Sequence, residues 1–185
     1  MNIGVLGGTF DPPHDAHLRI AERSIDQFSL DKVIFIPSGN PWQKKDATSY
    51  RHRYEMTKIL IGDSNDLEIS DIENSEEKPS YTYETLKKLN HPKEELYFIL
   101  GSDAAINIKT WKNYELLSNL TNFLIALRSE DNIDVLEKNF PFNYEIISGN
   151  KLDLSSTTLR NKLIEKNIEV SDLPSEVLTY IKENS

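Results

Sequence analysis

The chain has 185 residues, enough for one domain with a sizeable core, and its 30 acidic residues outnumber its 21 Lys and Arg residues to give a net charge of -9. This acidic balance argues against a nucleic-acid-binding protein, because affinity for phosphate backbones comes chiefly from clustered Lys and Arg. The chain has no cysteine, which excludes disulfides, thiolate metal ligands and a cysteine nucleophile.

No stretch of the sequence is long and apolar enough to cross a bilayer. The first apolar run is not preceded by a basic leader of the kind that opens a secretory signal. We therefore expect a cytoplasmic protein that has no membrane partner. A homo-oligomer is compatible with the sequence, which does not specify the number of subunits.

Short apolar runs and amphipathic segments alternate along the whole chain. The apolar runs, typical of strands buried on both faces of a sheet, cover residues 2–8, 32–37, 67–72, 96–100, 122–127 and 144–147. Helices are predicted from Asp15 onward and over residues 49–61, 83–89, 114–120, 133–139, 154–166 and 175–183.

This β–α alternation predicts an α/β fold, a Rossmann-like doubly wound parallel sheet with helices on both faces. No Pro- and Gly-rich linker divides the chain. We therefore expect a single domain over residues 1–185, with the C-terminal helical part, from about 155 to 185, packed on it. In such folds, ligands bind beyond the carboxyl ends of the strands.

The stretch GVLGGTFDPPHDAH follows the first predicted strand and occupies the loop at its carboxyl end. Gly7 and Gly8 would let the backbone turn sharply and approach a ligand closely. The stretch is not the G-x-G-x-x-G dinucleotide motif, because Phe10 and Pro12 stand where the later glycines would be. A plain tight turn is the alternative for the glycine pair alone.

Two histidines, His14 and His17, stand at the start of the helix predicted from Asp15. Both rings would face the volume that receives the free N–H groups and the positive dipole end of this helix, which attracts anions. A metal site is the rival interpretation, but no third ligand is evident nearby and H-x-x-H is not the H-E-x-x-H zinc motif. We therefore expect an anion site and no metal bound by protein side chains.

A second stretch, LSSTTLR, combines a helix start with several hydroxyls. Ser155 is a candidate N-cap, and Ser156, Thr157 and Thr158 would add hydroxyls beside unpaired N–H groups. Arg160, one turn along, would reach the same anion with its planar guanidinium. A well-capped surface helix is the alternative. Two helix starts with this chemistry suggest a polyphosphate that bridges them.

With these motifs the chain resembles a known family. GGTFDPPHDAH is similar to the G-G-T-F-D-P-x-H-x-G-H signature of nucleotidyltransferases, and LSSTTLR is similar to their distal I-S-S-T-x-I-R signature. Three further pieces, PSYTYETL, ILGSDAAINIKTW and LPSEVLTYI, narrow the resemblance to bacterial nicotinate-nucleotide adenylyltransferases. The resemblance implies adenylyl transfer from ATP to nicotinate mononucleotide, a step of NAD biosynthesis that yields deamido-NAD and pyrophosphate.

The resemblance also implies roles for residues on the ATP side. The residues that would contact phosphates and stabilise charge in the transition state are His14, His17, Lys44 and Arg160. Ser156 and Thr157 would hold the β/γ-phosphate end of ATP together with Arg160, and the residues that would form the rest of the ATP site are Gly8, Thr9, Phe10, Gly101 and Asp103. Mg²⁺ would travel with the ATP phosphates, since no all-protein carboxylate cage is visible in the sequence.

On the nicotinate side, the resemblance implies that the backbone of the S-Y-T stretch, with Tyr81 and Thr82, meets the carboxylate. It also implies that Trp111 stacks on the pyridine ring. Judged from the residues alone, Trp111 would be a core aromatic instead.

The chain departs from the family pattern in two places. Ala16 replaces the glycine between the two histidines, a small change that a helix tolerates. Trp42 and Gln43 stand where the family has proline and histidine, while Lys44 keeps the cation. A lysine or glutamine would therefore have to make the phosphate contact of the missing histidine.

Two alternatives to this function stay open at the level of the sequence. One is a related adenylyl- or cytidylyltransferase that uses another phosphorylated acceptor, such as nicotinamide mononucleotide or phosphopantetheine. The other is a nucleotide sensor that has kept the fold and lost turnover. The retained histidine pair and Arg160 argue against the sensor.

Overall fold

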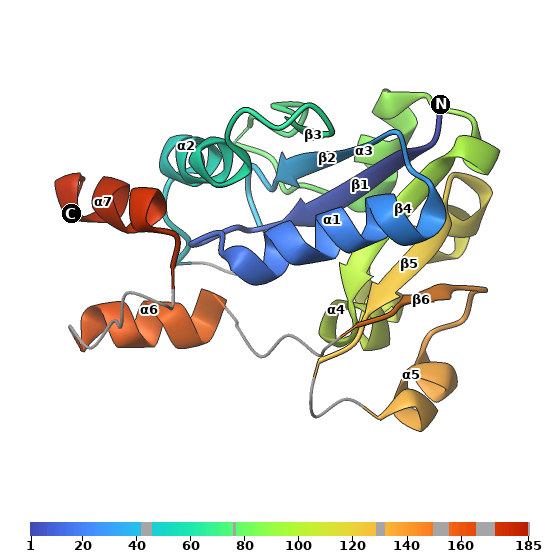
Figure 1. Cartoon of the computed structure of the whole chain (residues 1–185). Coiled ribbons are helices and arrows are strands. Elements are labelled where there is room, and N and C mark those ends of the chain that lie inside the picture. Colours follow the sequence, from blue (N-terminus) through green and yellow to red (C-terminus); the bar gives the residue numbers. More distant parts are fainter. Residues whose placement is uncertain (42–45, 76, 129–131, 150–155, 166–172, 185) are drawn as a thin grey trace.

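A parallel sheet forms the centre of the molecule (Figure 1). The computed structural model describes residues 1–41, 46–75, 77–128, 132–149, 156–165 and 173–184. Within these residues the strands are β1 (Ile3–Gly8), β2 (Lys32–Pro37), β3 (Leu67–Ile69), β4 (Leu96–Gly101), β5 (Asn122–Ala126) and β6 (Glu145–Ile147). They pair in the order β3-β2-β1-β4-β5-β6. The strand order reverses between β1 and β4, where doubly wound folds open a ligand-binding crevice.

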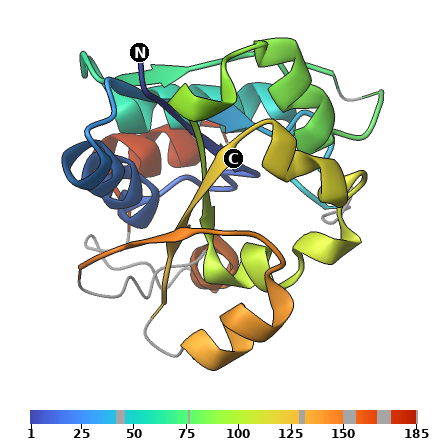
Figure 2. The same cartoon turned by 90° about the vertical axis from the view of Figure 1, so that its right-hand side faces the viewer.

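Helices connect the strands and cover both faces of the sheet. In chain order they are α1 (Asp15–Phe28), α2 (Tyr50–Ile61), α3 (Thr82–Leu89), α4 (Ser102–Ile106), α5 (Ile133–Asn139), α6 (Ser156–Ile164) and α7 (Ser175–Glu183). Turns of 3₁₀ helix occupy Lys93–Glu95, Ile108–Thr110 and Tyr114–Asn119. Residues of α1, α2 and α7 pack on one face, and residues of α3, α4 and α5 pack on the other (Figure 2).

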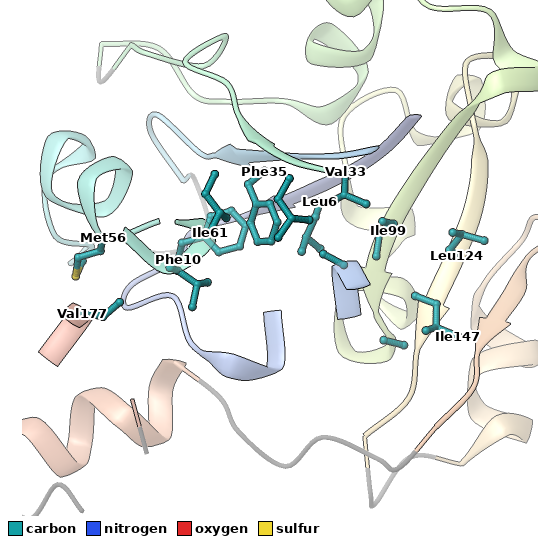
Figure 3. Packing of buried hydrophobic residues seen from close by; sticks show 14 of the residues in the cluster. Leu6, Phe10, Val33, Phe35, Met56, Ile61, Ile99, Leu124, Ile147 and Val177 are labelled. Atoms are coloured by element: carbon teal, nitrogen blue, oxygen red, sulfur yellow. The ribbon is translucent and has the colours of Figure 1, made fainter. Parts of the chain in front are cut away.

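Each face of the sheet has its own buried core, because alternate residues of the continuous apolar strands point to opposite sides. In β4, Ile99 joins the cluster under α1 and α2, whereas Phe98 and Leu100 join the cluster under α3, α4 and α5. In Figure 3 the side chains of the first cluster form a row across the view, with Phe10 near one end and Ile147 at the other. Phe10, from the loop after β1, is therefore also part of the core.

The predicted α/β doubly wound fold is confirmed, and most predicted helices and strands lie within a residue or two of the observed ones. The predicted strand 67–72 is cut short as β3, because a turn closed by the bond from Asn74 N to Asp71 O (2.8 Å) takes the chain away from the sheet. The predicted helix 114–120 is a 3₁₀ turn. Helix α4 was not predicted, because its 5 residues are too few to show a helical period.

The C-terminal helices share the first core cluster. Leu159, Leu173 and Val177 are buried in it, and α7 packs beside α2 (Figure 1). The Tyr180 hydroxyl lies 2.9 Å from Nδ1 of His52 on α2. This packing agrees with one domain that includes the C-terminal helices, and the domain boundaries stay a prediction.

Candidate active site

A cavity of about 930 Å³ lies beyond the carboxyl ends of β1 and β4. The predicted site residues that line it are Gly8, Thr9, Phe10, His14, His17, Tyr81, Thr82, Gly101, Asp103, Trp111, Ser156 and Thr157. Trp42, Gln43, Lys44 and Ser155 lie outside the described residues. The fold thus brings residues from position 8 to position 157 around one volume, although they come from five separate loops and helix starts.

The loop after β1 is held in shape by the side chain of Phe10. Its backbone has a φ of 51°, a left-handed conformation that is costly for a bulky residue and needs support from its surroundings. Burial provides that support, because Phe10 is only 1% exposed and packs against Phe35. A Cβ on Gly8 would lie 3.1 Å from the same ring. The ring also meets His17 edge-on, with 4.9 Å between centroids.

The histidine pair sits at the start of α1, where His14 is the N-cap residue. The His14 and His17 rings stack with 3.9 Å between their centroids. The backbone N–H of His14 donates to Nδ1 of His17 over 3.2 Å. A neutral His17 ring therefore carries its proton on Nε2. Phe10, His14 and the helix start together fix the His17 ring in one orientation.

Burial keeps His14 neutral. Its side chain is 3% exposed, and burial, helped by the charge of Arg128, lowers its pKa from 6.5 to about 4. Nδ1 of His14 is buried and makes no hydrogen bond within the described residues. Buried polar atoms normally have a partner, and the capping box at the start of α1 directs the His17 backbone N–H at the His14 side chain.

Arg53 ties the loop after β1 to the segment after β2. Its side chain is 1% exposed and donates to three backbone carbonyls. Nε bonds Thr48 O (2.7 Å), Nη1 bonds Thr9 O (2.8 Å) and Nη2 bonds Gly39 O (3.1 Å). Hydrogen bonds from a charged donor are stronger than neutral ones, so Arg53 holds the position of Thr9 at the cavity. The sequence gives no signal for this role, because an arginine on α2 looks like a solvent-exposed residue.

Glu73 binds the N–H of Gly39, whereas Arg53 binds the Gly39 carbonyl. Its carboxyl group accepts hydrogen bonds from the Gly39 N–H, from Ser80 and from Thr85 Oγ1, the last over 2.5 Å. Burial raises the pKa of Glu73, against the lowering effect of these hydrogen bonds. A Cβ on Gly39 would lie 1.8 Å from the Glu73 carbonyl oxygen, so only glycine fits there. Arg53 and Glu73 thus join the loop after β1 to the start of α3.

Helix α6 docks against the same loop from below the sheet in Figure 1. Ser156 Oγ donates to Pro12 O over 2.9 Å, and Nη1 of Arg160 donates to Asp11 O. Nη2 of Arg160 bonds Thr157 Oγ1 (3.2 Å). The Arg160 guanidinium therefore fastens α6 to the loop in this structure, while Ser156 and Thr157 line the cavity.

One cation at the cavity, Arg128, was not predicted. Arg128, two residues beyond β5, pairs with Asp103 on α4 through Nη2 and Oδ2, 3.2 Å apart. Both residues line the cavity, and the charge of Arg128 reaches His14, whose pKa it helps to lower. The signal was available, because a polar residue just past a predicted parallel strand lies at the binding edge of the sheet.

The predicted nicotinate side has partly exposed aromatic residues instead of buried polar ones. Trp111 packs edge-on against Phe98, with 6.1 Å between centroids, and also lines the cavity. Its packing fits the interpretation as a core aromatic, and its role in stacking on the pyridine stays a prediction. Tyr81 is the N-cap residue of α3 and Thr82 its first residue. The ammonium of Lys112, which was not predicted, lies 4.4 Å from the centroid of the Tyr81 ring.

The described part of the chain contains no group of three His, Cys, Asp or Glu side chains suited to hold a metal ion. The histidine pair thus lacks, within those residues, the further ligands that a protein metal site needs. Over the same residues, no helix has the length and apolar character needed to span a membrane.

Comparison with known proteins assigns the chain to a family. Residues 5–162 match the cytidylyltransferase-like family model. The "Probable nicotinate-nucleotide adenylyltransferase" of Clostridium novyi (strain NT) is 41% identical over 171 residues, which cover 86% of each chain. The protein of the same name from Geotalea daltonii is 37% identical over 99% of this chain and 96% of its own. The chain belongs to the nicotinate-nucleotide adenylyltransferase family.

Solved structures agree with this assignment. Plasmodium falciparum nicotinic acid mononucleotide adenylyltransferase, complexed with NaAD, is 26% identical and superposes with a TM-score of 0.82 over 99% of this chain and 95% of its own. The same protein complexed with APC gives a TM-score of 0.79. The resemblance of this chain to nicotinate-nucleotide adenylyltransferases is therefore confirmed at the level of family and fold. The roles of individual site residues stay predictions.

Proposed function

We propose that the protein transfers the adenylyl group of ATP to nicotinate mononucleotide, releasing pyrophosphate and forming deamido-NAD. The observation that carries this proposal is the cavity itself, in a chain of this family. One end presents His14 and His17 at a helix start, and the other presents Tyr81, Thr82 and Trp111. A single volume of about 930 Å³ is large enough for a dinucleotide-sized product.

The reaction needs no general base. An oxygen of the 5′-phosphate of nicotinate mononucleotide, already anionic, attacks the α-phosphorus of ATP. The bond from that phosphorus to the bridging oxygen breaks, and the pair of electrons leaves with pyrophosphate. Catalysis then requires in-line positioning of the two phosphates and donors for the charge on the transferring group.

His17 and His14 suit those requirements in different ways. His17 offers the Nε2 proton, and its ring is held by Phe10 and by the His14 N–H. His14 meets the phosphates as a neutral ring, since its pKa is lowered to about 4. We assign both rings to the α-phosphate region, with the positive end of the α1 dipole beside them.

The remaining ATP contacts belong to the proposal as well. Ser156 and Thr157 would meet the β- and γ-phosphates, joined by Lys44 and Arg160. For Arg160 this requires that its guanidinium exchange the Asp11 carbonyl for a phosphate oxygen. Mg²⁺ enters as part of the ATP substrate, bound to its phosphates, since the described residues offer no cluster of three ligands.

A cytoplasmic location follows for an enzyme that uses ATP and a mononucleotide, and it remains part of the proposal. A homo-oligomer is likewise kept as a prediction. Neither enters the mechanism, because every step described above uses residues of one chain.

The decisive experiment measures pyrophosphate release by the purified protein with ATP and a panel of acceptors. Nicotinate mononucleotide should support turnover, with kcat/KM at least about tenfold above that of nicotinamide mononucleotide, because a carboxylate suits the helix start at Thr82. Phosphopantetheine and ATP alone are the negative controls. Mass spectrometry of the product checks that deamido-NAD is formed.

Other outcomes would change the assignment in defined ways. A tenfold or larger preference for nicotinamide mononucleotide would replace the acceptor and leave adenylyl transfer intact. Binding of ATP by calorimetry, without pyrophosphate release for any acceptor, would make the protein a nucleotide sensor.

A further inference from the structure

The side chain of Lys112 reaches the first turn of α3 from the segment that carries Trp111. Its Nζ lies 4.4 Å from the centroid of the Tyr81 ring and 3.5 Å from Oε1 of Glu84. These two contacts flank Thr82, the first residue of the helix. The ammonium is therefore at the mouth of the helix start that the nicotinate carboxylate would approach.

Two positive features converge on this part of the cavity. The first N–H groups of a helix have no partners within it and carry the positive end of its dipole, and the Lys112 ammonium adds a full charge beside them. Thr82, Trp111 and Lys112 all line the same cavity. A ring that rests on Trp111 and points its substituent at Thr82 would place that substituent next to the ammonium.

We propose that Lys112 is a specificity-determining residue, whose charge favours the carboxylate of nicotinate mononucleotide over the uncharged amide of nicotinamide mononucleotide. This inference rests on the proposed function, because it concerns the acceptor of the same site. The backbone N–H groups of α3 can bind either substituent, since an amide oxygen also accepts hydrogen bonds. The partial charge of the helix dipole favours the carboxylate, and the full charge of the Lys112 ammonium adds to that preference.

The carboxyl groups nearby leave the ammonium available. Glu84 is 53% exposed and pairs with Lys112 over a long 3.5 Å contact, and exposed pairs of this kind contribute little. Glu73 also lines the cavity, but Gly39, Ser80 and Thr85 occupy its carboxyl group. Because the Lys112 side chain is itself 48% exposed, solvent screening limits the selectivity that it provides to about three- to tenfold.

The test compares both acceptors in Lys112→Met, which keeps the length of the side chain and removes its charge. For nicotinate mononucleotide, kcat/KM should fall about three- to tenfold, while the value for nicotinamide mononucleotide changes less than about twofold. The KM for ATP should stay constant. Lys112→Arg should restore the preference, and raising the salt concentration should lower it in the wild type but not in Lys112→Met.

Lys109→Met is the matched control, because Lys109 is exposed, lies in the preceding 3₁₀ turn and does not line the cavity. It should leave the preference unchanged. If nicotinamide mononucleotide turns over too slowly, its inhibition constant against nicotinate mononucleotide gives the same comparison. Equal losses for both acceptors in Lys112→Met, or no loss for either, would overturn the role of Lys112. A wild type that does not use nicotinate mononucleotide at all would overturn the proposed function instead.

Discussion

The two ends of the cavity are built by different means. At the histidine end, buried side chains hold the site: His14 is 3% exposed, Phe10 belongs to the core, and Arg53 bonds the loop from within. At the nicotinate end, Trp111 is half-buried and Lys112 is exposed, and they are held mainly by ring contacts.

Because of this difference in burial, the two ends suit different tasks. Charge stabilisation in a transition state depends on donors that are fixed before the reaction begins, and the histidine end has that rigidity. Choosing between a carboxylate and an amide needs only a difference in charge, which a more exposed end can supply. Substitutions at the first end should therefore affect turnover most, and substitutions at the second should affect acceptor binding.

The largest effect is expected from His17→Ala. Removing the Nε2 donor should lower kcat/KM about a hundredfold or more, the scale of losing one donor to a developing charge, with the fold retained. Steady-state kinetics measures the loss of kcat/KM, and a thermal melt checks that the fold is retained. His91→Ala is the control, since His91 bonds Met1 O away from the cavity. Near-normal turnover in His17→Ala would mean that the rigid end does not carry the chemistry.

The next largest expected effect is a loss of stability at acid pH, which should arise at the buried histidine end. The folded state binds a proton on His14 less well than the unfolded chain, since the pKa falls from 6.5 to about 4. Stability should therefore be lost as the pH falls through this window, by about 3 kcal/mol from His14 alone. Urea unfolding between pH 7 and 4 should show a smaller loss for His14→Asn, which keeps a good N-cap. An unchanged pH dependence would mean that His14 titrates normally, whereas His91→Asn should follow the wild type.

The smallest effect is expected from Trp111→Ala. If Trp111 stacks on the pyridine as proposed, losing its ring should raise the KM for nicotinate mononucleotide roughly tenfold and leave the KM for ATP unchanged. Trp111→Phe should recover most of the loss. A general loss of stability with equal changes in both KM values would identify Trp111 as a core residue and remove the difference between the two ends.

The sequence predicts the loop after β1 well, because its glycines, prolines and histidines are rare in that combination and sit at the end of an apolar run. It also places Trp111 and Thr82 through the family resemblance. It does not reveal Arg53 or Glu73, since helix α2 and the segment after β3 place their charges where a solvent-exposed residue is expected. Both bond the Gly39 peptide, which is distant from each of them in the chain, and no spacing rule connects them.

The same limit applies to Arg160 and Lys112. The sequence places Arg160 on a helix start with anion-binding chemistry, but the bond from its guanidinium to the Asp11 carbonyl depends on how α6 packs against the loop. Lys112 follows Trp111 directly, yet only the folded chain brings it over the Tyr81 ring, 31 positions earlier in the numbering. Contacts of this kind arise from tertiary packing, and no local pattern encodes them.

The Gly39 peptide links the loop after β1 to the segment at the start of α3. Its carbonyl is bonded to the residue that holds Thr9, and its N–H to the residue that holds Ser80 and Thr85. A side chain at that position would collide with the Glu73 carbonyl, so the tie between these two walls of the cavity depends on a residue without a side chain.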